Sequence, residues 1–279
     1  MNADFNYEQL QRFTASDRQE CLVRIATLLG EQYRLKDPGE GLRSLPIFEH
    51  TSSAVEFSAI PGGAFVMGLT EQQERAARKI ANPPPLNISE LRPAGERLVS
   101  SFLISRMPIS IVTVTNLVGA SCLSDFDQRN REETFPAYVR RDTALRVAEL
   151  LTCRLPYETE WEYACRAKTK TLFPWGNVLL PRQKMQHWLD LARPEKSQAN
   201  AFGLCALFSG DWCMDEYRMS HADDAAVLKG AYVIKGGGSV FWPWQGCGEW
   251  IWCMPANRMP STGLIEDRCA FRLVRQFAA

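Results

Sequence analysis

The sequence predicts a mixed α+β protein, because strand-like and helix-like segments alternate along a single chain. Apolar runs on both sides of a Pro-Gly-Gly turn predict a β-hairpin at 55–68, and β-branched residues predict further strands at 98–115. A helix is expected at 143–152, and a second helix is expected to begin after Pro156. Proline-rich and glycine-rich stretches between these segments predict much irregular loop.

Residues 1–52 are predicted to form a helical N-terminal extension, and residues 53–279 to form the main domain. Apolar side chains recur at helical spacing between Leu22 and Leu29, and the segment 37–41 is interpreted as a linker. A chain of 279 residues with 46% hydrophobic content is long enough to bury a large core.

The overall charge excludes a general attraction to nucleic acids or to anionic membranes, since 32 basic residues balance 32 acidic ones. The N-terminus lacks a basic and apolar leader, and no stretch approaches the roughly twenty apolar residues of a membrane span. A cytoplasmic protein without membrane or nucleic-acid partners is therefore expected. The nine cysteines contain no Cys-x-x-Cys pair and are interpreted as buried, reduced thiols.

Five ordered motifs between Val55 and Arg275 resemble the formylglycine-generating-enzyme (sulfatase-modifying factor) family. The motifs are Ile60-Pro61-Gly62-Gly63-x-Phe65-x-Met67-Gly68, Arg154-Leu155-Pro156-x-x-x-Glu160-Trp161-Glu162-Tyr163-Ala164, Phe173-Pro174-Trp175-Gly176-Asn177, Asn200-Ala201-Phe202-Gly203-Leu204, and Gly236-Gly237-Gly238-Ser239 with Ala270-Phe271-Arg272-Leu273-Val274. The resemblance implies a C-type-lectin-like fold with a short antiparallel sheet, two main helices and long loops that build a binding face. It does not by itself imply an oxidase, because function depends on the site and not on the fold.

The oxidase members of this family hold Cu(I) with two cysteines that follow the Gly-Gly-Ser motif, and soft thiolates suit that ion. Counting from Ser239, the first of these positions holds Trp242 and only the second holds a cysteine, Cys247. Cys253 is a possible second thiol, but it lies off the family pattern. If the chain is an oxidase, Cys247 and Ser239 are its catalytic candidates; otherwise no cofactor is expected.

Two further metal sites of the family have few matching residues here. One branch of the family holds iron with three histidines, whereas His50, His187 and His221 are widely separated in this sequence. The family's calcium-binding segment aligns with 210–214, where its Asn and Glu oxygen donors are missing. Calcium stays an alternative through Asp211, Asp215 and Glu216, because it requires six to eight oxygen ligands.

The stretch 240–268 differs most from the family pattern. Four of the eight tryptophans lie in it, and interspersed proline and glycine residues disrupt both helical and strand periodicity. Aromatic side chains between glycines are typical of recognition surfaces, where a polar rim surrounds them. The predicted ligand-binding residues are Phe241, Trp242, Trp244, Gln245, Cys247, Glu249, Trp250, Trp252, Asn257, Ser261 and Thr262.

Some relatives keep the fold, lack the chemistry and use this face to bind ligands, as in the variable proteins of diversity-generating retroelements. By this resemblance the chain is predicted to be a non-catalytic binding protein for another protein or a small molecule. Three alternatives stay open. The tryptophans could partly fill the core, with at least two on the face; the chain could be a copper-dependent oxidase of cysteine in a protein substrate; or it could be a regulatory domain that docks through its N-terminal helix.

Overall fold

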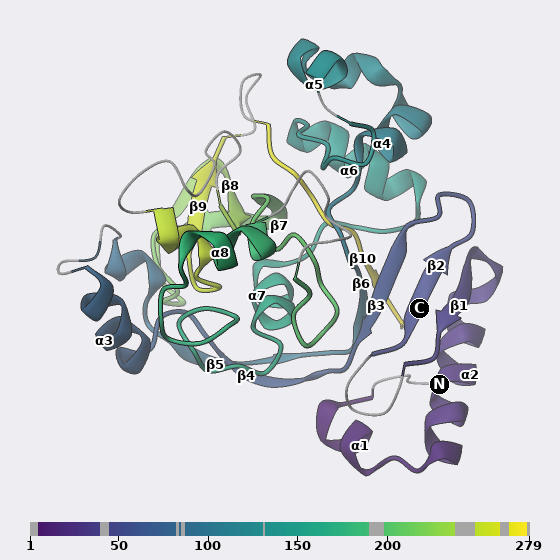
Figure 1. Cartoon of the computed structure of the whole chain (residues 1–279), viewed down its shortest axis with the longest axis horizontal. Helices are drawn as coiled ribbons and strands as arrows, with labels where there is room; N and C mark the ends of the chain where they lie inside the picture. Colours follow the sequence, from purple (N-terminus) through teal and green to yellow (C-terminus); the bar gives the residue numbers. More distant parts are fainter. Residues whose placement is uncertain are drawn as a thin grey trace.

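Eight α-helices and three antiparallel sheets make up the described part of the chain, which confirms the predicted α+β class (Figure 1). The computed structural model describes residues 5–39, 45–81, 84, 87–130, 132–189, 198–237, 249–262 and 268–277. The helices are α1 (Tyr7–Arg12), α2 (Ala15–Leu29), α3 (Glu71–Ile80), α4 (Ile111–Val118), α5 (Asp125–Asn130), α6 (Arg141–Leu150), α7 (Glu158–Arg166) and α8 (Arg182–Leu189). Among these, α6 and α7 correspond to the two helices predicted after residue 143.

The largest sheet has five strands in the order β1 (Tyr33–Asp37), β2 (Ile47–His50), β3 (Glu56–Ile60), β6 (Phe102–Ser105) and β10 (Val274–Gln276). Every neighbouring pair in it is antiparallel. Consecutive residues of β6 are all buried, so both faces of the sheet are covered at its centre. Two smaller sheets pair β4 (Gly63–Met67) with β5 (Gly95–Val99), and β7 (Asp211–Arg218) with β8 (Val227–Lys235) and β9 (Arg258–Ser261).

The predicted hairpin at 55–68 is wrong in its pairing. Both strands exist, but β3 pairs with β2 and β6 while β4 pairs with β5, so the Pro-Gly-Gly segment links two different sheets. Gly62 lies at this crossing, where an added Cβ would be 2.8 Å from the Val99 carbonyl oxygen. The close approach of the backbones requires glycine there, and a short turn motif alone does not reveal it.

The prediction of strands across 98–115 is correct for β5 and β6 but wrong for its last part. Residues 111–118 form helix α4, although the run contains several β-branched residues. Ser110 caps the helix by accepting a hydrogen bond from the Thr113 backbone, and the buried Ile111 and Val114 face the core. Capping and tertiary packing therefore outweigh the intrinsic β-propensity of this run.

Residues 1–52 contain the helices α1 and α2. The helical spacing predicted between Leu22 and Leu29 corresponds to α2, whose apolar face is buried through Leu22, Ile25 and Leu29. The segment is not entirely helical, because β1 and β2 form two strands of the main sheet. The proposed division at residue 52 stays a prediction, although the sheet runs across it. None of the described helices has the length and apolar character that a membrane crossing requires.

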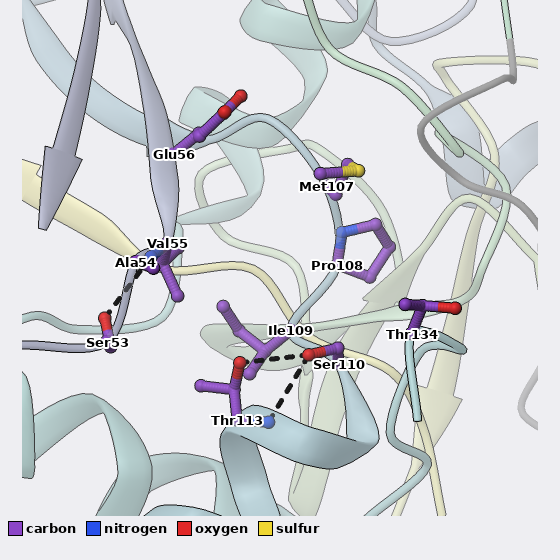
Figure 2. A pocket seen from close by; sticks show the side chains of 10 residues that line it. All are labelled: Ser53, Ala54, Val55, Glu56, Met107, Pro108, Ile109, Ser110, Thr113 and Thr134. Carbon is purple, nitrogen blue, oxygen red and sulfur yellow. Dashed lines mark hydrogen bonds between the residues drawn. The ribbon is translucent and has the colours of Figure 1, made fainter. Parts of the chain in front are cut away.

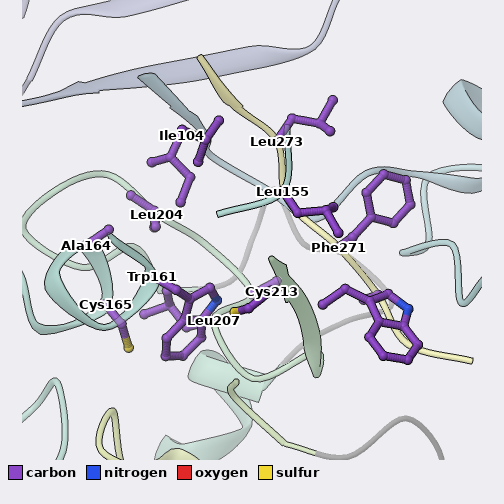
Figure 3. Packing of buried hydrophobic residues seen from close by; sticks show 14 of the residues in the cluster. Ile104, Leu155, Trp161, Ala164, Cys165, Leu204, Leu207, Cys213, Phe271 and Leu273 are labelled. Atoms are coloured by element: carbon purple, nitrogen blue, oxygen red, sulfur yellow. The ribbon is translucent and has the colours of Figure 1, made fainter. Parts of the chain in front are cut away.

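The core extends continuously from the five-stranded sheet to α7 and the C-terminal segment. Figure 3 shows part of it: Trp161 and Cys165 of α7 lie beside Leu207, and Phe271 and Leu273 precede β10. The family-like motifs thus contribute buried side chains that join α7 to the strands near residues 236 and 270.

Candidate functional site

Asp211, at the start of β7, is fully buried and binds three side chains. Its Oδ2 accepts hydrogen bonds from Trp161 Nε1 at 2.8 Å and Arg272 Nε at 2.9 Å. Its Oδ1 accepts one from Ser209 Oγ at 2.8 Å. The terminal nitrogens of Arg272 donate to four backbone carbonyls, those of Ser105, Arg106, Cys205 and Ala206. This arrangement fixes the C-terminal segment against α7 and β7.

A second set of buried charges lies one strand further across the same sheet. Lys235 of β8 is in register with Asp211 of β7 on one side and with Arg258 of β9 on the other. Directly paired residues project to the same face of a sheet, and here that face packs on α7. The register therefore brings a row of charged side chains against the helix that carries Glu158 and Glu162.

We call the five residues Glu158, Glu162, Arg166, Lys235 and Arg258 the charge cluster. Lys235 Nζ lies 3.0 Å from Glu162 Oε2, and Arg258 Nη2 lies 2.9 Å from Glu158 Oε2. Arg166 Nη2 lies 2.8 Å from Glu162 Oε1, which also accepts a hydrogen bond from the Gly68 amide. Burial raises the pKa of Glu162, but Lys235 and Arg166 outweigh it and hold this pKa at about 2.

Gly236 continues directly from Lys235 and fits tightly against the core. Its φ is +72°, and an added Cβ would lie 2.3 Å from the Leu207 carbonyl oxygen and 2.7 Å from Trp161 Cζ2. No larger residue fits at this position without moving backbone. We call Trp161, Asp211, Arg272 and Gly236, together with the charge cluster, the frame, because they fix the chain immediately before residue 238.

An aromatic cluster surrounds Trp250, which follows the segment 238–248 in the sequence. Trp250 lies in the short 3-10 helix Glu249–Cys253 and contacts Phe173 edge to face, with the two ring centroids 6.1 Å apart. Phe173 stacks on Trp175 with 4.9 Å between the ring centroids, and the ring of Trp175 contacts that of Trp188 in α8 with 5.3 Å between the centroids. Trp175 and Trp188 are both partly exposed. We call these four residues the aromatic wall.

Trp175 and Trp188 are not among the ligand-binding residues that the sequence predicts. Trp175 belongs to a family-like motif, and Trp188 lies in none of the motifs. The only available signal was the excess of aromatic residues in the segments 173–175 and 188, which lie far from 240–268 in the sequence. Their proximity to Trp250 depends on the tertiary fold.

The predicted ligand-binding residues occupy several environments. Phe241, Trp242, Trp244, Gln245 and Cys247 lie outside the described residues, as does the catalytic candidate Ser239, and so does the side chain of Glu249. Trp250, Asn257 and Ser261 are buried. Trp252 is half-buried and Thr262 is exposed.

Trp250, Asn257 and Ser261 are expected to lie on an accessible face, but their side chains are buried. Trp250 lies in the 3-10 helix, Asn257 in the turn after it and Ser261 at the end of β9. The burial of Trp250 matches the alternative in which some tryptophans fill the core. Which residues contact a ligand stays a prediction.

The carboxylates considered for calcium do not form one group. Asp211 is occupied by its three donors, and Asp215 accepts a hydrogen bond from the Glu158 amide at 2.6 Å. Glu216 is exposed. Within the described residues, the three carboxylates do not gather their oxygens within 4.8 Å of one another. These residues therefore do not fit a shared calcium site.

A different group, formed by two carboxylates and one imidazole, does bring its potential ligand atoms within 4.8 Å of one another: Glu158, Glu162 and His221. However, the oxygens of Glu158 and Glu162 are already neutralised by Lys235 and Arg258. Burial lowers the pKa of His221. A metal ion would have to displace two buried cations, so this group is better described as part of the charge cluster than as a metal centre.

The thiol chemistry that copper requires is not favoured at the described cysteine nearest to the Gly-Gly-Ser motif. Cys253 is fully buried, and burial raises the pKa of its thiol. A thiolate, not a thiol, is the ligand that a soft metal ion binds. Cys253 therefore does not fit the role of partner to Cys247.

A pocket of about 260 Å³ opens between the start of β3 and the N-terminus of α4 (Figure 2). Among its described lining residues only Glu56 is charged, and it is paired with Lys36 and Arg106. The hydroxyls of Ser110 and Thr113 bond to each other at 2.9 Å as part of the α4 cap. These contacts give the pocket structural roles and no reactive group of its own.

Comparisons with known proteins find a matching family model, proteins similar to a short part of the sequence, and solved structures with a similar fold. A family model described as "Sulfatase-modifying factor enzyme 1-like domain" matches residues 46–277. The formylglycine-generating enzyme of Bos taurus is 51% identical over 43 residues, which is 15% of this chain and 11% of that protein. That of Mus musculus is 54% identical over 39 residues, 14% of this chain and 10% of that protein. The matched segments thus span only about a tenth of these enzymes.

Two solved structures share the fold. PvdO from Pseudomonas aeruginosa has a TM-score of 0.60 and 19% identity, covering 82% of this chain and 97% of that one. Variable protein 1 from Treponema denticola has a TM-score of 0.53 and 16% identity, covering 81% of this chain and 97% of that one. At these identities the likeness is one of fold.

Proposed function

Because this chain belongs to the family of sulfatase-modifying factor 1-like domains, we propose that it is a binding member of that family without oxidase activity. Its site is the face formed by 241–262 together with the exposed edge of the aromatic wall. Its ligand is another protein or a small molecule. The likeness in fold to a protein named a variable protein is consistent with such a role.

The observation that carries this proposal is the frame that fixes the start of the aromatic-rich segment. Breaking a buried ion pair by removing one partner typically costs about 3–5 kcal/mol, so the frame strongly resists local rearrangement. None of its residues lies between 238 and 248. The segment therefore starts from a fixed point that does not depend on its own side chains.

The aromatic wall supports the same proposal. Partly exposed Trp175 and Trp188 extend the apolar surface beyond the segment that the sequence marks. Tryptophan gives a large contact area with few rotatable bonds, which is why it is enriched where binding energy concentrates. Trp250 joins this surface to the aromatic-rich segment through its contact with Phe173.

A displayed-peptide library tests the binding proposal. Peptides are selected on the full chain and then measured against a variant with Phe241, Trp242 and Trp244 all replaced by serine. We expect affinity to fall by about tenfold or more, because the anchors are removed. The matched control is Leu98→Ser, which removes an apolar side chain of β5 that is 83% exposed. Equal binding by the triple variant would overturn the proposal.

The oxidase alternative has a separate readout. The full chain is incubated with Cu(I), oxygen and a cysteine-bearing sulfatase peptide, and the peptide is analysed by mass spectrometry for conversion of cysteine to formylglycine. We expect no conversion. Conversion that disappears in Cys247→Ser would instead establish the enzyme.

The finer assignment to retroelement variable proteins is tested in the gene's neighbourhood. A nearby reverse-transcriptase gene with a near-copy of the segment encoding 236–274, differing mainly at adenines, would support it. An adjacent sulfatase gene without such a copy would support the oxidase alternative.

A further inference from the structure

A pocket of about 280 Å³ is lined by the start of α6, the residues that follow α4 and Arg268 of the C-terminal segment. Figure 1 shows α4 and α6 packed side by side. The lining of the pocket contains three arginines and no carboxylate among the described residues. The lining residues are Val118, Ser121, Cys122, Arg140, Thr143, Arg146 and Arg268. We call it the basic pocket.

The sequence explains why these side chains meet. Arg140, Thr143 and Arg146 follow at intervals of three residues and so lie along one face at the start of α6. Arg268 reaches the same place from the other end of the chain. The backbones of Cys269 and Val139 exchange hydrogen bonds of 3.0 and 3.1 Å, and Arg268 Nη1 donates to the Cys122 carbonyl at 2.6 Å.

The positive charge of the basic pocket is only partly neutralised. Arg140 pairs with Asp142, with Nε 3.2 Å from Oδ1. Among the residues that the structure describes, Arg146 and Arg268 have no carboxylate partner within salt-bridge distance. Burial raises the pKa of the Cys122 thiol while the charges of Arg268 and Arg146 lower it, so both guanidinium groups act on the same point.

The helix adds to this charge. The pocket lies at the N-terminal end of α6, whose cap residue Arg140 makes no side-chain capping bond. The dipole of that end favours negative charge. The amide and the hydroxyl of Thr143 already donate to Asp142 Oδ1, whereas the hydroxyl of Ser121 lines the pocket as a further donor.

From this geometry we infer that the basic pocket binds a phosphate group, either as free phosphate or as the terminal group of a small phosphorylated molecule. Guanidinium forks match the oxygens of phosphate in pairs, which gives both affinity and orientation. Arg146 and Arg268 come from distant parts of the chain, have no carboxylate partner among the described residues, and would contact the anion from two sides. The inference does not depend on the ligand of the 241–262 face.

Isothermal titration of the full chain tests this site, with inorganic phosphate and phenyl phosphate as probes at constant ionic strength. We expect a dissociation constant on the order of 1 mM or tighter for at least one probe. Arg146→Gln should weaken binding by about tenfold, since it removes a charged hydrogen-bonding partner. Arg146 is exposed, so this variant should fold. Arg146→Lys should retain part of the affinity, because it keeps the charge without the fork.

The control is Arg24→Gln, an exposed arginine of α2 with the same change in net charge. Tighter binding of phenyl phosphate than of phosphate would identify a phosphorylated small molecule as the ligand class. Tighter binding of phosphate would identify the free ion. Either result supports the site. No binding of either probe, or equal loss in Arg24→Gln and Arg146→Gln, would overturn it.

Discussion

Asp211 accepts hydrogen bonds from three side chains that come from different parts of the sequence. Its partner Arg272 is fully buried, and its remaining nitrogens are bound to backbone carbonyls. Asp211 and Arg272 are both fully buried, so water cannot replace a hydrogen-bond partner that either of them loses. The loss of one partner therefore leaves a buried charge or donor unsatisfied.

Asp211→Asn should destabilise the fold by about 3–5 kcal/mol, because it leaves the Arg272 guanidinium buried without a counter-charge. Urea unfolding measures the effect. Asp224→Asn, an exposed acid, is the control and should change stability little. The loss should be the same with calcium and with a chelator; a loss seen only with calcium would show that Asp211 is a calcium ligand.

Glu162 predicts an acid-sensitive step. Its folded pKa of about 2 lies below its ordinary value of 4.5, so it stabilises the fold above pH 4.5 and loses that contribution as pH falls toward 2. The difference corresponds to about 3 kcal/mol. Unfolding free energies measured between pH 6 and pH 3 should fall in wild type and fall less in Glu162→Gln. The exposed Glu149→Gln serves as control, and a wild-type curve that stays flat would contradict the assignment.

At the scale of elements, β8 is held most tightly where it ends. Lys235 is bound within the charge cluster, and Gly236 packs against Trp161 and the Leu207 carbonyl. The same strand contains Gly230, which has a similar φ of +75° but no atom within 4 Å of an added Cβ. Substitutions at Gly230 therefore report backbone strain alone, whereas substitutions at Gly236 report backbone strain and steric overlap together.

Gly230→Ala should cost only the backbone strain of about 1–2 kcal/mol. Gly236→Ala should cost clearly more, because its Cβ would overlap backbone that must then move. Thermal unfolding of both variants measures the difference. Equal losses would mean that the contact at Gly236 relaxes freely and that the frame is softer than described.

The elements show what the sequence can predict and what it cannot. The helix expected at 143–152 corresponds to α6, and Pro156 correctly marks the start of α7. The β-branched residues at 109–115 predict a strand, but residues 111–118 form α4, since the burial of this run against the core is not visible in the sequence. The pairing of β3 with β6 was missed because the two strands are joined only after the β4–β5 excursion.

The candidate site could also be predicted only in part, because local sequence patterns do not reveal contacts between distant residues. The aromatic-rich segment is conspicuous in the sequence, and its family-like flanks were recognised. The sequence shows Glu162 only as part of a family-like motif, whereas the structure joins it to Lys235 across 73 residues. A contact of that separation leaves no local pattern to read.

On the scale of the whole molecule, the N-terminal segment belongs to the main sheet through β1 and β2. Deleting residues 1–52 should therefore lower the melting temperature by more than about 10 °C or prevent folding, because two strands and the cover of α2 are lost. Deleting residues 1–4, which removes none of the described residues, is the control. Unchanged stability after the longer deletion would favour a separate docking segment.

The frame also has a consequence for protein engineering. Its charged and glycine contacts lie outside 241–247, so libraries with randomised codons in that stretch should retain a common folding stability across their members. The chain is thus a suitable scaffold for selecting artificial receptors, in which residues 241–247 are randomised and the buried ion pairs are kept constant.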